Sequence, residues 1–287
     1  MKKTFGLPVF VWILSIAIGV MPFFWMKPGE MDLGGDGSRL FFYDPVNYLR
    51  YSVLFVIQNV GAGIENPLTF FLPFNLMLIG LQGILKSGYL IITLFNSFHL
   101  VAAFISMYLI SKELFGHVKK KDTLAIEISG VVVGILYVFS PVLVRSAWDK
   151  AIITHAQFFL NPLMFYLLLK IFTTEKLKYI ILFLFLTLIF STNFSWAAAP
   201  LLFSFYPLSL CFIFAFCMFI LKKKISFRIV LSLVIWFLAL HSFHYLPLIV
   251  NIIQGSGIVA DKIAQTGGVA NPALEYFLES ARHITLL

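Results

Sequence analysis

Charged residues are scarce in this chain: they make up 12% of its 287 residues, whereas 60% are hydrophobic. A water-soluble domain carries about 25% charged residues, so this composition excludes an ordinary soluble protein. The apolar residues form continuous runs, several of them long enough as helices to cross the ~30 Å hydrocarbon core of a bilayer. The sequence therefore predicts an all-α fold: a polytopic transmembrane helical bundle.

Cysteine and the common catalytic motifs are also nearly absent. The two cysteines, Cys211 and Cys217, lie within one apolar run, where cysteine usually serves as a small apolar side chain. There is neither a Walker A sequence nor an HExxH sequence. The net charge of +8 does not indicate a nucleic-acid partner, because the basic residues form short clusters between the apolar runs.

Seven apolar segments are predicted to cross the membrane, and an eighth, 69–86, is ambiguous because it contains proline, asparagine, glutamine and two glycines. The predicted spans are 5–26, 88–111, 125–144, 155–172, 179–198, 201–221 and 228–250. We expect the first to be a retained signal anchor, because no small-residue cleavage site follows it.

The basic residues decide the orientation. With a cytoplasmic N-terminus and 69–86 not crossing, 13 of the 21 lysines and arginines lie on the cytoplasmic side. If 69–86 crossed, the clusters 119–121 and 222–224 would move outside, against the positive-inside rule. We therefore expect about seven spans in the plasma membrane, with 27–87 and 251–287 both extracytoplasmic.

The first outer loop, 27–87, is the main polar segment of the chain. Asp44 and the proline after it form a helix-start signal, and 46–57 is predicted to be a short amphipathic helix lying on the membrane. A turn is expected at 61–67 and a second interfacial or re-entrant helix at 70–86. Irregular backbone at membrane depth must lie against protein or a wet cavity, so this loop indicates a cavity at the outer face.

Two carboxylates in this loop are candidate catalytic groups. Asp36 lies between glycines, which lets a substrate approach closely, and it could act as a general base. The alternative is that Asp36 belongs to an ordinary solvated acidic loop. For Asp44, helix capping alone explains the Asp-Pro pair.

Several cations are predicted on the outer face, against the positive-inside preference. Arg39, Arg145 and Lys150 could hold a lipid phosphate, with Trp148 beside the last two and His155 at the start of the next span. Simple snorkelling of these long side chains at the interface is the alternative.

The remaining histidines give no clear metal signal. His99 lies within a span, and His241 and His244 lie one helical turn apart, but no third ligand stands at helical spacing. We interpret all three as core or interfacial residues. Few ionisable residues lie near mid-span, which argues against an ion-coupled pump.

The 251–287 segment ends in a helical pattern over 272–287 that stops without a cap. We expect the chain to form one module over 1–287 that continues in a longer protein.

These features resemble the polytopic glycosyltransferases of the GT-C class. Within that class they are most similar to the mycobacterial-type α-(1→3)-arabinofuranosyltransferase group. The segments that carry the resemblance are Asp36, the Asp44-Pro pair, 46–57, 61–67, 137–141, 192–199 and 275–281.

The resemblance implies an inverting enzyme that transfers a sugar, arabinofuranose by the closest match, from a polyprenyl-phosphate donor. The acceptor would be an extracytoplasmic hydroxyl of a glycan, lipid or protein. Asp36 would be the base and Asn193, in the 192–199 turn, would contact substrate. No cofactor is required, and a divalent cation is left open. The alternatives are a lipid-linked sugar flippase or transporter, and a non-catalytic scaffold of the same fold.

Overall fold

The computed structural model describes residues 8–25, 40–53, 56–57, 64–65, 72–118, 123–144, 157–190, 205–223, 225–243 and 245–246. Over these residues the chain is helical apart from turns and one pair of two-residue strands. The all-α prediction is therefore confirmed for the described part of the chain.

The helices follow the apolar runs of the sequence closely. Each of the seven predicted spans contains a helix: α1 Val9–Val20 with the 3-10 turn η1 Met21–Phe24, α5 Gly88–Val118, α6 Thr123–Val138 with α7 Pro141–Leu143, α8 Gln157–Thr174, α9 Leu177–Ile189, α11 Phe205–Ala215 with the π-helical η5 Phe216–Ile220, and a last helix, Phe227–Phe243.

The predicted outer loop contains three short helices and the strand pair. The helices are α2 Leu40–Tyr43, α3 Pro45–Val53 and α4 Leu72–Leu85. The helix expected over 46–57 is wrong at its end, because Val56–Ile57 forms strand β1, which pairs antiparallel with β2 Ile64–Glu65. Part of the expected 61–67 turn is therefore strand.

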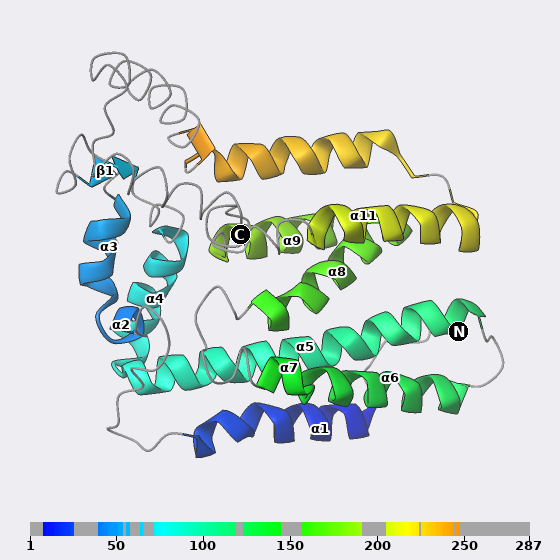
Figure 1. The fold of residues 1–287 in the computed structure, drawn as a ribbon, viewed down its shortest axis with the longest axis horizontal. Coiled ribbons are helices and arrows are strands. Elements are labelled where there is room, and N and C mark those ends of the chain that lie inside the picture. The colour runs from blue at the N-terminus through cyan, green and yellow to red at the C-terminus, as the bar shows by residue number, and fades with distance from the viewer. Residues whose placement is uncertain are drawn as a thin grey trace, which may run out of the picture.

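Helix α5 is central to the arrangement and packs against α1, α6 and α8, while α8 packs against α9 and α11. These helices and Phe227–Phe243 run side by side along the length of the molecule (Figure 1). Helices α3 and α4 pack on each other and stand crosswise at the end where α5 begins (Figure 1). The α4 helix predicted within 69–86 is confirmed, and its place relative to a membrane stays a prediction.

The bundle is apolar on its outward faces as well as in its core. The outward face of α1 carries large apolar side chains such as Ile13, which is 62% exposed, whereas Ser15 on its inner face is buried. In α6 the apolar Leu136 is 65% exposed. Buried polar side chains also occur in α5, α8, α9 and α11: Thr93, His99, Ser106, Ser111, Asn161, Thr187 and Ser209.

Two glycines let α6 approach α5 closely. Gly130 and Gly134 lie one turn apart, and a Cβ atom at either position would meet α5 side-chain and backbone atoms. At Gly134 it would lie 2.8 Å from the Phe104 ring and 3.0 Å from the Phe104 carbonyl oxygen. Such small-xxx-small pairs allow the close backbone approach typical of membrane helices.

In the described part of the chain, one helix, Gly88–Gly116, is long and apolar enough to cross a membrane, judged by length and composition alone. The other apolar helices have 10–17 described residues. A helix of 10–14 residues by itself is compatible with a protein core as well as with a membrane.

We predict that Gly134→Ala lowers the free energy of unfolding by about 1–3 kcal/mol, the usual cost of overpacking a tight contact. The added methyl group cannot be accommodated by a side-chain rotation alone, because one of its neighbours is a backbone carbonyl. Unfolding of the purified protein in mixed detergent micelles measures the change.

Gly80→Ala in α4 is the matched control, because no atom lies within 4 Å of a Cβ atom placed there. Alanine is the better helix former by about 1 kcal/mol, so this variant should be at least as stable as the parent. Equal stability of the Gly134→Ala and Gly80→Ala variants would contradict the close α5–α6 contact.

Candidate functional site

The candidate site lies at the end of the bundle where α2, α3 and α4 gather. Residue Asp44 separates α2 from α3 and is exposed. Its Oδ1 accepts a hydrogen bond from the Asn47 backbone N–H at 3.2 Å, and the Asn47 side-chain amide donates to its Oδ2. Asp44 therefore caps α3, with Pro45 in the first helical position.

The other predicted site residues lie outside the described residues. These are Asp36, Arg39, Arg145, Trp148, Lys150, His155 and Asn193. Their positions relative to Asp44 are therefore not described, and their roles stay predictions. The capping contact accounts for Asp44 without a catalytic role.

An aromatic layer seats the short helices on the bundle. Phe42 of α2 contacts Phe74 of α4 and Phe95 of α5, with ring centroids 6.1 and 5.1 Å away. Phe74 and Phe95 also contact Phe190, at 6.0 and 6.2 Å. Three of these rings are edge-on to one another, the geometry that aromatic pairs prefer.

A polar contact and a glycine fix the same helices further. The Gln82 side-chain amide donates to the Tyr43 carbonyl oxygen at 3.0 Å, which ties α4 to α2. Gly88, at the start of α5, leaves room for Tyr43, whose ring carbon would lie 2.5 Å from a Cβ atom there. The segment that follows the predicted Asp36–Arg39 site therefore rests on a well-packed base.

His99 lies directly beneath the aromatic layer in α5. It is buried, its Nδ1 lies 2.7 Å from the Phe95 carbonyl oxygen, and its ring packs against Phe95, Phe98 and Phe190. Because a carbonyl oxygen only accepts, Nδ1 carries the proton and Nε2 is left as an acceptor. Among the described residues, Nε2 has no hydrogen-bond partner.

The structure also shows a charged cluster at the opposite end of the bundle, which the sequence analysis did not identify as a unit. Lys112 of α5 pairs with Glu127 of α6, which also accepts a hydrogen bond from the Tyr108 hydroxyl. Lys170 of α8 pairs with Glu113 of α5. These pairs connect α5 to both neighbours. In the sequence, the adjacent Lys-Glu pair at 112–113 could have indicated a charged cluster. The partners, Glu127 and Lys170, can be identified only from the fold.

No group of three or more His, Cys, Asp or Glu side chains in the described residues could hold a metal ion. His241 is buried against Phe237, and its predicted neighbour His244 lies outside the described residues. Comparison with protein-family models, with characterised proteins and with solved structures gives no match.

We predict that Asp44→Ala weakens α3 locally by about 1 kcal/mol, because the orphan N–H groups of its first turn lose their acceptor. Asp44→Asn should leave α3 nearly as stable as in the parent, since asparagine caps helices as well as aspartate does. Amide hydrogen exchange of α3, read by mass spectrometry, measures both. If the α3 amides exchanged as fast in the asparagine variant as in the alanine variant, the capping explanation would be wrong. The negative charge of the Asp44 carboxylate would then be what stabilises α3.

Proposed function

We propose that the chain is a multi-pass membrane protein that catalyses glycosyl transfer at its extracytoplasmic face. The observation that carries the membrane part is the apolar outer surface of the bundle. Large apolar residues cover its outward faces, as with Ile13, Leu136 and Phe185. A soluble monomer rarely exposes contiguous apolar patches of more than a few hundred Å², whereas a bilayer solvates such a surface.

The buried polar groups fit the same proposal. The hydroxyls of Ser15 and Thr93 donate to carbonyl oxygens four residues earlier, both at 2.7 Å, and that of Thr187 donates to Leu184 at 2.8 Å. These three hydroxyls are therefore paired within their own helices, which is how a hydroxyl donor is satisfied in a hydrocarbon environment.

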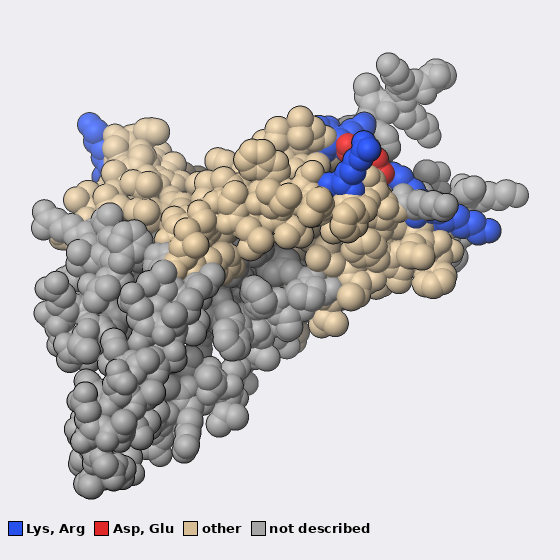
Figure 2. All heavy atoms as spheres, turned by 90° about the horizontal axis from the view of Figure 1, so that it is seen from above, with Lys and Arg blue, Asp and Glu red and all other residues tan. Residues whose placement is uncertain are grey.

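The charged residues support the orientation. Figure 2 shows blue and red atoms gathered at one end of the bundle and blue atoms alone at the opposite end, with uncharged residues along the described surface between the ends. The end with both colours is the one where α8 turns into α9 and α11 leads to Phe227–Phe243 (Figure 1). The described basic residues there are Lys112, Lys170, Lys176, Lys178, Lys222, Lys223 and Arg228. By the positive-inside rule this end is cytoplasmic.

The crosswise helices α3 and α4 then lie at the extracytoplasmic interface. The segment with Asp36 and Arg39 leads directly into α2, which is held by the aromatic layer. A rigid base beside a polar loop suits a site that must hold one substrate against another.

In the proposed reaction Asp36 takes the proton of the acceptor hydroxyl. The acceptor oxygen attacks the anomeric carbon of the donor sugar with inversion, and the bond to the polyprenyl phosphate breaks. The phosphate leaves with the bonding electron pair. Arg39 and Arg145 would hold it, because an arginine fork matches a pair of phosphate oxygens.

We predict that cysteines introduced at Asp36 and Lys262 react with an impermeant thiol reagent from outside, and that cysteines at Lys120 and Lys176 do not. The reason is that the basic end of the bundle is cytoplasmic by the positive-inside rule. Single-cysteine variants in sealed vesicles, in a Cys211→Ser, Cys217→Ala background, give the result. Labelling from outside at both Asp36 and Lys176 would end the seven-span arrangement and make α4 a crossing helix.

We predict that Asp36→Asn lowers turnover about 10²–10⁴-fold, the usual contribution of a general base. Release of polyprenyl phosphate from a panel of polyprenyl-phosphate sugars, arabinofuranose first, measures it in proteoliposomes with cell-envelope glycan as acceptor.

Asp32→Asn in the same loop is the control and should keep full turnover. If Asp36→Asn turned over donor as fast as the parent, Asp36 would not be the base. Movement of an intact lipid-linked sugar across the bilayer without release of phosphate would favour the transporter instead.

A further inference from the structure

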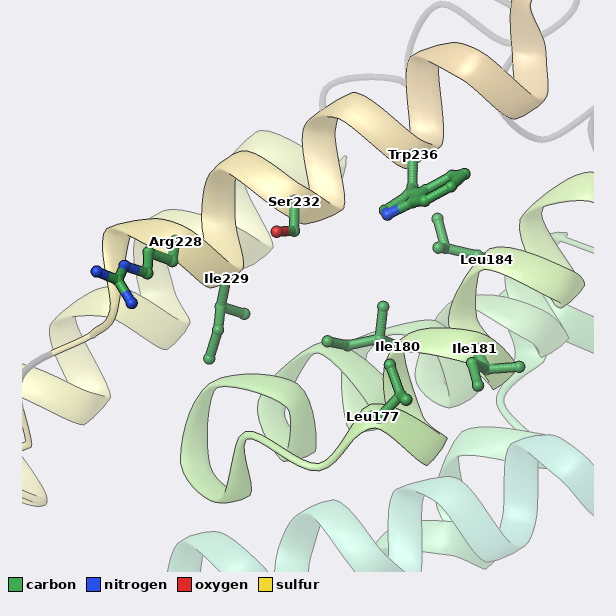
Figure 3. Close-up of a pocket in the computed structure, with 8 residues that line it drawn as sticks. All are labelled: Leu177, Ile180, Ile181, Leu184, Arg228, Ile229, Ser232 and Trp236. Carbon is green, nitrogen blue, oxygen red and sulfur yellow. The ribbon is translucent and has the colours of Figure 1, made fainter.

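A groove opens on the surface between α9 and the helix Phe227–Phe243, with a cavity volume of about 440 Å³. On the α9 side its wall is apolar, formed by Leu177, Ile180, Ile181 and Leu184. Figure 3 shows Ile229, Ser232 and Trp236 directed from the other helix toward α9. Leu177, Ile181 and Trp236 are all more than half exposed, so the groove is open to its surroundings.

One end of the groove is positively charged. Arg228, in the first turn of Phe227–Phe243, lies at this end, and the wall becomes apolar from there to Trp236. Trp236 lies eight positions after Arg228, which is about 12 Å along a helix. The groove therefore has a charged mouth and an apolar length, the two-part chemistry of a lipid.

Among the described residues, no acid neutralises the charge at the mouth. The salt bridges between described residues join Lys112 to Glu127, Lys170 to Glu113 and Lys223 to Glu175, and none includes Arg228. The first turn of α9, on the facing wall, contains no acidic residue. Glu175, the acid nearest to this turn in the sequence, is already paired with Lys223 at 3.3 Å.

We propose that this groove binds an anionic phospholipid of the phosphatidylglycerol type from the cytoplasmic leaflet. Its phosphate pairs with the Arg228 guanidinium, and one acyl chain lies along Ile180, Leu184 and Trp236. Basic pockets between membrane helices on the cytoplasmic side bind anionic headgroups in this way. The inference rests on the proposed membrane location and orientation, and not on the proposed glycosyl transfer.

The test is native mass spectrometry of the full chain in detergent, titrated with phosphatidylglycerol and, separately, with phosphatidylcholine. Arg228→Ala should weaken phosphatidylglycerol binding about fivefold, the effect of one basic residue near an anionic membrane surface. Phosphatidylcholine binding should be weaker in the parent and unchanged in the variant. Since Arg228 is exposed, its replacement should leave the fold intact, which circular dichroism checks.

Lys178→Ala is the matched control. It removes one positive charge from the same end, but Lys178 does not line the groove and its Nζ lies 4.9 Å from the centre of the Tyr179 ring. This variant should bind phosphatidylglycerol within about twofold of the parent, less than the single-charge effect at Arg228. A second variant, Ser232→Phe, fills the groove and should weaken both lipids.

Equal losses in the Arg228→Ala and Lys178→Ala variants, or equal binding of the two lipids by the parent, would overturn the proposal. The Asp36→Asn variant should bind phosphatidylglycerol like the parent, so a failure of glycosyl transfer leaves the lipid result standing. Conversely, outside labelling at Lys176 would place the groove in the other leaflet and refute the cytoplasmic source of the lipid.

Discussion

The close contact between α5 and α6 is the constraint on which the rest of the structure depends. Helix α5 packs against α1, α2, α4, α6 and α8, so its position determines where both ends of the bundle lie. Gly130 and Gly134 set the distance to α6, because any side chain there would meet α5 backbone. One turn beyond, the ion pair of Lys112 with Glu127 connects the same two helices. Close backbone packing along the helices and a charged link at their end therefore fix α5 in register with α6.

The two ends of α5 make different kinds of contact, and each kind suits its surroundings. At its C-terminal end, Lys112 and Glu113 form ion pairs with Glu127 and Lys170. At its N-terminal end, Phe95 joins the rings that seat α2 and α4. Partly exposed ion pairs are weak in water, typically below about 1 kcal/mol, so the packing of the apolar and aromatic residues holds the helices together. The ion pairs define which helix faces meet.

Most of the helices could be predicted from the sequence, because the apolar runs and the charged turns between them mark where each helix begins and ends. The helix start at Asp44 also follows from local chemistry alone. The end of α3 could not be predicted in this way, because the short pairing of β1 with β2 joins residues nine and seven positions apart that carry no period-2 pattern. For the candidate site, the sequence singled out Asp44 with capping as its alternative role, and capping is the contact observed. The partners of Lys112 and Lys170 were not predictable, since they come from helices 15 and 57 residues away.

His99 shows how the proposed site depends on the helix beneath it. Its Nδ1 is committed to the Phe95 carbonyl oxygen, so the ring cannot turn without breaking that bond. Phe95 and Phe190 each contact both His99 and Phe74 of α4. A shift of α4 would therefore disturb the rings that hold His99, and a change at His99 would disturb the base on which α2 rests. In a close-packed interior such strain is transmitted rather than absorbed. The position of α2, which follows the Asp36–Arg39 segment in the sequence, thus depends on a buried residue of α5.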